Sequence, residues 1–218
     1  ELAGRNNDYG LSSRAHRDSL AEPRPMDDAY REFWERFQQI LDVVLDEFEA
    51  HYFSTHEFID HLLENAEPSY EQAKSVRNHV PGNPLTLSYF FENASADWLG
   101  PLRKAKFFTS PPASPNPSEG STTFYGWPAS QYLARIASEV PEEVRDVILA
   151  IPETDNWRVH YDMTDAACSM PPGIAVPIAE RETDWISERG KLCFPLASQL
   201  GTLVSHLARG GEEEVAIG

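Results

Sequence analysis

The chain has 218 residues, which is long enough to bury the core of one large domain or of two small ones. Its 35 acidic residues outnumber its 18 lysines and arginines and give a net charge of −17. Because binding to a phosphate backbone needs clustered cations, this composition argues against direct nucleic-acid binding. No apolar run is long enough to span a membrane, and no signal-peptide pattern is present.

The two cysteines indicate the cellular compartment, and the first residue indicates the candidate partners. Cys168 and Cys193 lie in apolar helical patterns without a CxxC motif, which favours reduced, buried thiols and a cytoplasmic protein. The chain begins with Glu1 and not with Met, as a piece of a longer protein or a trimmed chain would. Other domains of the same polypeptide are therefore candidate partners, and the oligomeric state is left open.

The N-terminal part predicts an arm followed by a long helix. Residues 1–26 are polar without sustained periodicity, which is typical of an extended arm or linker. A long amphipathic helix is predicted from Asp27 or Asp28 onward. Its apolar positions are Tyr30, Phe33, Trp34, Phe37, Ile40, Leu41, Val44, Phe48 and Tyr52. Residues 27–67 hold twelve acidic residues against two arginines, which could mark a surface for a basic partner, although such a face is more often simply solvated.

A second and a third helix are predicted to follow the long one. Ser54 or Thr55 is expected to cap the second helix, with Glu57 near the N3 position of a capping box. Pro68-Ser69 opens the third helix, which ends at the breaker Pro-Gly-Asn-Pro over residues 81–84.

Two more segments complete a predicted helical bundle over residues 27–108. Residues 85–93 are rich in strand-forming side chains, but their apolar positions and helical surroundings favour a helix. Ser95 or Asp97 is expected to cap the next segment, in which Pro101 is tolerated because it falls in the first turns.

A long loop is predicted over residues 109–126. Four prolines, four serines and two glycines among its eighteen residues exclude a helix. Loops of this length in a compact region are often functional or disordered. The loop could also mark a boundary between the helical bundle and the region after it.

Residues 127–211 predict a helical-repeat region, followed by a tail over residues 212–218. Helices are expected over 129–139, 141–151, 156–170, 174–186 and 195–209, with Thr154 or Asp155 capping the third. A shift of thirty residues aligns apolar positions of the first two helix pairs, and the aligned pairs are Leu133 with Met163, Ala137 with Ala167, Val140 with Met170, Val144 with Ile174, and Ile148 with Ile178. Helix pairs with turns that contain proline predict a short α-solenoid in an all-α protein.

The runs WLGPLRKAKFFTSPP, YGWPASQYLARIA and PEEVRDVILAIPETDNWRVHYDM resemble HEAT-like helical modules of large bacterial multidomain proteins. The resemblance covers roughly residues 83–186 and rests on the general pattern of the helix pairs, without catalytic motifs. Such proteins often join the helical region to an NTPase or nuclease domain, and some belong to defence systems. The resemblance implies a linking, sensing or partner-binding role and transfers no functional residue.

The motifs of common enzyme classes are absent from the sequence. It contains no GxxxxGK[ST], GxGxxG, HExxH or GxSxG, and no Arg precedes a His at the spacing of HEPN-type helical ribonucleases. These absences argue against an autonomous enzyme, and no cofactor is predicted.

Three groups of polar residues are candidate sites. His51, His56, Glu57 and His61 offer metal-ligand residue types, but helical histidines near turns are more often surface residues, so no metal is predicted. Asp162 and Asp165, with His160 nearby, could form an acid/base group, but without a nucleophile a solvated helix face is the preferred interpretation. The run Arg77-Asn78-His79 could hold an anion, but capping of a helix end is commoner.

Candidate protein-contact residues lie around the loop. Phe124, Tyr125 and Trp127 close it, and aromatic side chains with polar loops suit interfaces, although they could simply anchor the loop. The basic run Arg103, Lys104 and Lys106 stands out in an acidic chain and could pair with the acidic first helix, within the chain or across a dimer.

The sequence thus predicts a non-enzymatic helical scaffold that mediates protein–protein contact or domain linkage in a larger bacterial protein. One alternative is a regulatory domain of a multidomain NTPase or nuclease whose catalytic site lies outside this chain. Another is a sensor that binds a small ligand between helices of the N-terminal bundle.

Overall fold

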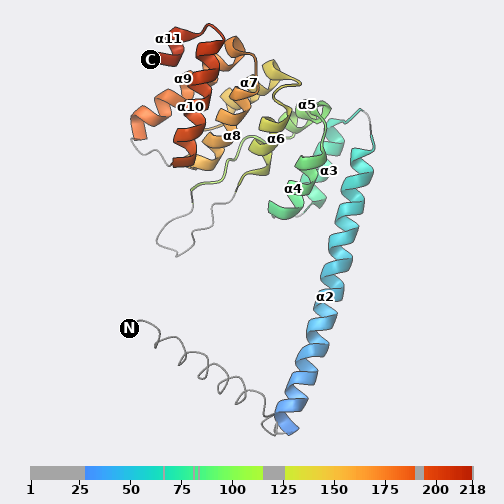
Figure 1. Ribbon diagram of the computed structural model, residues 1–218. Coiled ribbons are helices and arrows are strands. Elements are labelled where there is room, and N and C mark those ends of the chain that lie inside the picture. Colours follow the sequence, from blue (N-terminus) through green and yellow to red (C-terminus); the bar gives the residue numbers. More distant parts are fainter. Residues whose placement is uncertain are drawn as a thin grey trace, which may run out of the picture. The chain divides into compact units, whose positions relative to one another are not determined.

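The computed structural model describes residues 28–65, 67–80, 82, 84–114, 126–189 and 194–217 (Figure 1). These residues form ten α-helices and one short 3-10 helix, and no strand occurs among them. The predicted all-α class is therefore confirmed. The chain divides into two compact units, and the boundary in the sequence falls between Tyr52 and Phe53. The predicted domain boundaries at residues 26, 108, 126 and 211 stay predictions.

Helix α2 runs without interruption from Asp28 to Leu63 and so contributes to both units. The predicted end of a first helix and start of a second at Ser54 or Thr55 is wrong. Neither Gly nor Pro lies between Asp28 and Leu63, and Ser and Thr cost only a fraction of 1 kcal/mol, about 0.5, inside a helix. Thr55 is moreover buried, so packing in the second unit favours continuing the helix there.

The next helices form where local signals predict them. In α3 (Tyr70–His79) the Ser69 side chain and the Gln72 side chain make a reciprocal capping box. Residues 85–93 are helical, as predicted, within α4 (Pro84–Asn93). The short helix η1 (Ala96–Trp98) then leads into α5 (Leu99–Lys104), where Pro101 occupies the first turn.

Six helices follow the loop, and prolines open three of them. The helices are α6 (Pro128–Ile136), α7 (Pro141–Ala150), α8 (Trp157–Cys168), α9 (Pro172–Arg189), α10 (Phe194–Arg209) and α11 (Glu213–Ile217). Because the first N–H groups of a helix have no partner within it, Pro is well suited to these starts. The cap predicted for α8 is wrong: Asn156, and not Thr154 or Asp155, accepts a hydrogen bond from the Arg158 N–H.

Helix α8 lies in the middle of the second unit and packs against α6, α9 and α10. Further contacts join α3 to α5, α4 to α6, α5 to α7, α7 to α9, and α11 to α9 and α10 (Figure 1). One continuous hydrophobic cluster extends from Ile59 to Leu207. Three of the five pairs aligned by the thirty-residue shift are buried alike, namely Leu133 with Met163, Ala137 with Ala167 and Ile148 with Ile178. In the other two pairs, Val140 and Ile174 are only partly buried.

Candidate functional site

The predicted contact residues do not all fall within the described structure. Phe124 and Tyr125 lie outside the described residues. Trp127 occupies the N-cap position of α6 and packs, half-buried, against the core, so it fixes the point at which the loop enters α6. As a contact surface this set of aromatic residues stays a prediction.

The basic residues Arg103, Lys104 and Lys106 gather at the end of α5 and are exposed. Lys106 has a φ of 62°, in the left-handed region that favours glycine. Its N–H bonds to Arg103 O at 3.1 Å and the Phe107 N–H bonds to Leu102 O at 3.1 Å, which together close the helix in a Schellman motif. A lysine therefore stands where glycine would be the less strained residue, and its charge is held at the end of the helix.

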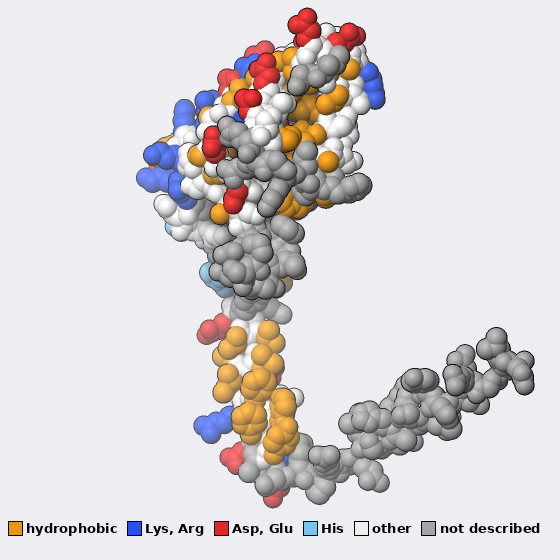
Figure 2. Space-filling view, turned by 90° about the vertical axis from the view of Figure 1, so that its left-hand side faces the viewer, with side chains coloured by type: hydrophobic (Ala, Val, Ile, Leu, Met, Phe, Trp, Pro, Cys, Tyr) orange, Lys and Arg blue, Asp and Glu red, His pale blue; other side chains and the backbone are white. Residues whose placement is uncertain are grey.

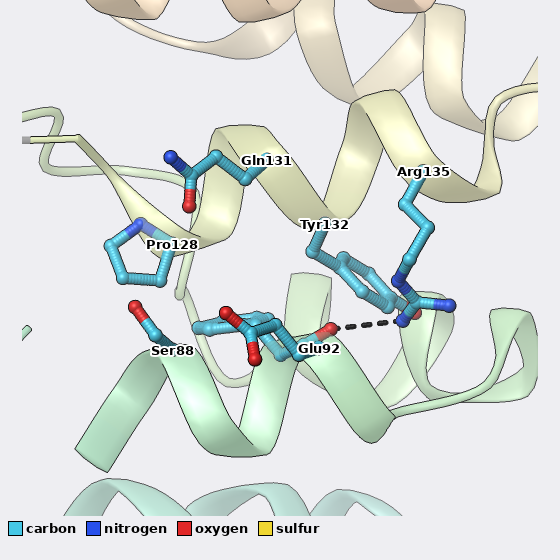
Figure 3. Close-up of a pocket in the computed structure, with 7 residues that line it drawn as sticks. Ser88, Glu92, Pro128, Gln131, Tyr132 and Arg135 are labelled. Carbon is cyan, nitrogen blue, oxygen red and sulfur yellow. Dashed lines mark hydrogen bonds between the residues drawn. The ribbon is translucent and has the colours of Figure 1, made fainter. Parts of the chain in front are cut away.

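A groove of about 260 Å³ lies between α4 and α6, close to the end of the loop (Figure 3). We call it the α4–α6 groove, and its lining residues are Ser88, Phe91, Glu92, Pro128, Gln131, Tyr132 and Arg135. Figure 3 shows Ser88 and Glu92 on α4 opposite Pro128 and Gln131 on α6. Ligand pockets for drug-sized molecules are typically about 300–1,000 Å³, so this groove fits one side chain or a small group.

Two residues at the floor of the groove donate hydrogen bonds to backbone carbonyl groups. The buried Tyr132 donates a hydrogen bond from its hydroxyl to Ser95 O at 2.8 Å, and burial raises the pKa of the phenol. Arg135 donates to Phe91 O at 2.9 Å, in the last turn of α4, and also to Ala94 O, just after the helix. Ser88, Glu92 and Gln131 thus remain as the polar rim over an aromatic base.

A buried polar pair joins α8 to α9. His160 is 1% exposed and Glu182 is 0% exposed, and Nδ1 of His160 lies 2.7 Å from Oε2 of Glu182. Nε2 of His160 lies 3.1 Å from Thr154 O, which can only accept, so Nε2 carries a proton. The Trp185 ring stacks on the imidazole with centroids 3.7 Å apart, and its Nε1 donates to the same carbonyl group.

Asp162 joins α8 to α6. Its Oδ2 accepts a 2.6 Å hydrogen bond from the Ser130 hydroxyl, and Oδ1 lies 3.7 Å from Nε of Arg158. Burial raises the pKa of Asp162 to about 6; the Ser130 hydrogen bond and the Arg158 charge lower it, and Asp165 raises it. We call His160, Asp162, Ser130 and Glu182 the buried α8 network.

The preferred interpretation of His160 and Asp162 as a solvated helix face is wrong, because α6, α9 and α10 cover α8 and only Asp165 of the three is exposed. Sequence reasoning also missed Glu182. A signal existed: Ala175, Ile178 and Glu182 follow one another at spacings of three and four residues, so Glu182 lies on the apolar stripe of α9. A charged residue at such a position requires a buried partner.

The start of the loop is tied to the segment between α7 and α8. Thr154 and Asn156 both donate side-chain hydrogen bonds to Pro112 O, each at 3.2 Å. The Ser114 N–H donates to the Asp155 carboxylate at 2.9 Å. The segment between α7 and α8 therefore holds Pro112 and Ser114 in place.

The other candidate groups of polar residues do not form a site among the described residues. No group of three or more His, Cys, Asp or Glu side chains there is placed to hold a metal ion. Because α2 continues through Ser54, His51 and His61 lie ten residues apart on one helix, about 15 Å along its axis. Arg77 donates to Ala105 O at 2.7 Å and so caps the end of α5. Burial raises the pKa of the Cys168 thiol to about 11, while Cys193 is not described.

Comparison of the chain with protein-family models, with curated proteins and with solved structures found no match. Within the described residues, no helix combines the length and the apolar character needed to cross a membrane.

The raised pKa of Asp162 predicts a pH-dependent stability. Between about pH 4 and pH 6 the folded chain binds a proton that the unfolded chain has released, so this contribution is largest below pH 4 and is lost as the pH rises through 6. An Asp162→Asn variant should therefore gain on the order of 2 kcal/mol relative to the natural chain between pH 4.5 and pH 7.5. Urea unfolding of both chains at the two pH values checks this, and a difference that does not change with pH would contradict it.

Proposed function

We propose that the chain is a non-enzymatic helical scaffold, in which a short HEAT-like stack of helix pairs mediates protein–protein contact within a larger bacterial protein in the cytoplasm. The observation that carries the proposal is the pattern of helix contacts, in which every second helix along the chain packs against the next one of its row. Helices α4, α6, α8 and α10 pack successively in one row, and α5, α7, α9 and α11 pack in the other. In α-solenoids each helix packs against its counterpart in the next repeat in this way.

A repeated hydrogen-bond device supports the same arrangement. In three places a side chain bonds to carbonyl groups at the end of the helix two places earlier. Arg135 of α6 binds the end of α4, and Arg181 of α9 binds Ile148 O and, at 2.9 Å, Ile151 O at the end of α7. His206 of α10 lies 2.8 Å from Met170 O, just after α8. Each row is thus linked by side chains as well as by apolar packing.

The hydrogen bonds that the buried polar side chains make support a scaffold and not a catalyst. His160, Glu182 and Asp162 bond to one another's helices or to the backbone, and the imidazole is 1% exposed. Catalytic groups need to reach a substrate, whereas these side chains join α8 to its neighbours. Exposed polar groups of the second unit converge with apolar surface at the α4–α6 groove. They do so again at a pocket of about 240 Å³ lined by Glu153, His160, Arg181, Asp184 and Trp185, in which the imidazole is almost fully covered.

We assign the partner contact to the α4–α6 groove together with the basic end of α5. The groove offers an aromatic base with a polar rim, which suits one anchoring side chain of a partner protein. Arg103, Lys104 and Lys106 supply positive charge for an acidic segment of that partner. The loop over residues 109–126 enters α6 beside the groove, so it is a third candidate for the contact.

Photo-crosslinking in the native cells tests this assignment on the whole protein. A photoreactive residue in place of Gln131 or of Lys104 should yield one and the same crosslinked product of defined mass, because both positions border the proposed contact. The same residue in place of Glu142, which is exposed in the first turn of α7, is the matched control and should yield much less. Equal products at all three positions, or none at Gln131 and Lys104, would contradict the contact. A saturable thermal shift with a nucleotide or Zn²⁺ would contradict the scaffold itself.

A further inference from the structure

The first 25 residues of α2, Asp28–Tyr52, form an amphipathic helix in which every side chain that the structure describes is exposed. Figure 2 shows hydrophobic side chains gathered along this helix. The large apolar residues exposed there are Tyr30, Phe33, Trp34, Phe37, Ile40, Leu41, Val43, Val44, Leu45 and Tyr52. Their exposed fractions range from 40% for Trp34 to 60% for Ile40.

This face needs a partner on energetic grounds. Isolated helices are marginal in water, and helices in proteins draw most of their stability from packing an apolar face. The aromatic side chains are about half exposed, and a fully buried aromatic residue covers about 150–250 Å². With the aliphatic residues, the face offers on the order of 600–800 Å² per helix, close to the about 800 Å² per partner of a standard interface. Scattered exposed apolar residues need no explanation, but a continuous face of this size does.

The spacing of the face identifies the kind of partner. Tyr30, Trp34, Phe37, Leu41 and Val44 follow one another at intervals of four, three, four and three residues, the a/d spacing of a coiled coil. Phe48 continues the pattern in the sequence. A seam with an average period of 3.5 residues packs against another long helix that has the same period.

We propose that the face of α2 binds the same face of a second copy, as an antiparallel pair of helices. In an antiparallel pair the a position of one helix meets the d position of the other. One alignment places Trp34 opposite Val44 of the second copy and Leu41 opposite Phe37 of the second copy. Both of these layers join an aromatic side chain to a smaller aliphatic one, while Tyr30 falls opposite Phe48 of the second copy. A parallel pair would instead stack Trp34 on Trp34 and Phe37 on Phe37, which crowds the same layers.

The distribution of charged residues on α2 favours a second copy of the chain as the partner. Its acidic residues at register positions b and f, on the side away from the seam, are Asp28, Glu32, Glu35, Asp42, Asp46 and Glu49. Among the acidic residues of this part of α2, Glu47 alone occupies a position that flanks the seam, so self-association brings few like charges together. A basic protein drawn to the acidic side would leave the apolar face uncovered. This inference does not depend on the partner proposed for the α4–α6 groove, because it concerns a different unit of the chain.

Sedimentation equilibrium of the full chain tests the proposal. We expect a dimer, and a Leu41→Glu variant should weaken the dimer by about 100-fold or more because it places a charge in the seam. The matched control, Gln39→Glu, adds the same charge at position f and should leave the dimer unchanged. A monomeric natural chain would overturn the proposal, whether the face meets another part of the chain or another protein. A dimer that resists Leu41→Glu would overturn it as well.

Crosslinking tests the orientation without disturbing the seam. In a background with Cys168→Ser and Cys193→Ser, a Gln38→Cys chain should form covalent dimers with a short thiol-reactive crosslinker, because position 38 lies near its own counterpart in the antiparallel pair. Gln39→Cys should not, since position f faces outward. Equal crosslinking of the two variants, or none at position 38 in a chain that sediments as a dimer, would overturn the antiparallel pair.

Discussion

A Glu182→Ala variant should lose about 3–5 kcal/mol of stability, the largest effect we expect from a single polar substitution in this chain. The carboxylate is fully buried, and its Oε2 lies 2.7 Å from Nδ1 of His160, which is 1% exposed. Removing it leaves a buried ring nitrogen without its partner and removes the direct bond between α8 and α9. Urea unfolding at pH 7.5, compared with the natural chain, measures the loss.

Two further variants separate the buried pair from a general effect on α9. Glu180→Ala changes an exposed residue of the same helix and should cost less than about 1 kcal/mol. A chain with both His160→Leu and Glu182→Leu should recover much of the loss, because a buried pair of polar side chains can often be replaced by apolar residues of similar size. If Glu182→Ala cost no more than Glu180→Ala, the pair would not hold α8 and α9 together.

An Arg181→Ala variant should lose about 2–4 kcal/mol, because hydrogen bonds to charged groups contribute more than neutral ones. The half-buried guanidinium group donates to Ile148 O and Ile151 O, and so satisfies two carbonyl groups at the end of α7. The substitution leaves both oxygen atoms without this partner. Thermal or urea unfolding checks the value.

Arg145→Ala is the matched control for Arg181. Arg145 is half-buried too, but its hydrogen bonds go to the carboxylate of its neighbour Asp146, so its loss should cost less than about 1 kcal/mol. Arg181→Lys should lie between, since an ammonium group does not have the forked geometry that reaches two carbonyl groups. A loss from Arg181→Ala equal to that from Arg145→Ala would contradict the capping role.

Local signals in the sequence were sufficient to locate most helices. Proline at the first position predicts the starts of α6 and α7, at Pro128 and Pro141, and the Ser69–Gln72 capping box marks the start of α3. These signals act within one turn, so periodicity and capping rules detect them. The predicted cap of α8 lies one or two residues too early because Thr154, Asp155 and Asn156 are all good capping residues.

The buried α8 network could not be predicted in the same way. His160 and Glu182 are 22 residues apart, and Ser130 and Asp162 are 32 residues apart, so each pair exists only once the helices have packed. Periodicity assigns a residue to a face of its own helix but does not say which helix covers that face. The uninterrupted α2 shows the converse: a good local cap at Ser54 was overridden because Thr55 is buried in the second unit.

Hydrogen exchange on the native full chain tests the proposed stack of helix pairs most directly. If each helix pair is held mainly by its neighbours, the amide groups of α8 should exchange most slowly, and exchange should become faster toward α4 on one side and α11 on the other. Glu182→Ala should then speed exchange in α8 and α9 far more than in α4. The same opening free energy for every helix of residues 53–217, with α4 and α9 equally affected by Glu182→Ala, would contradict the stack.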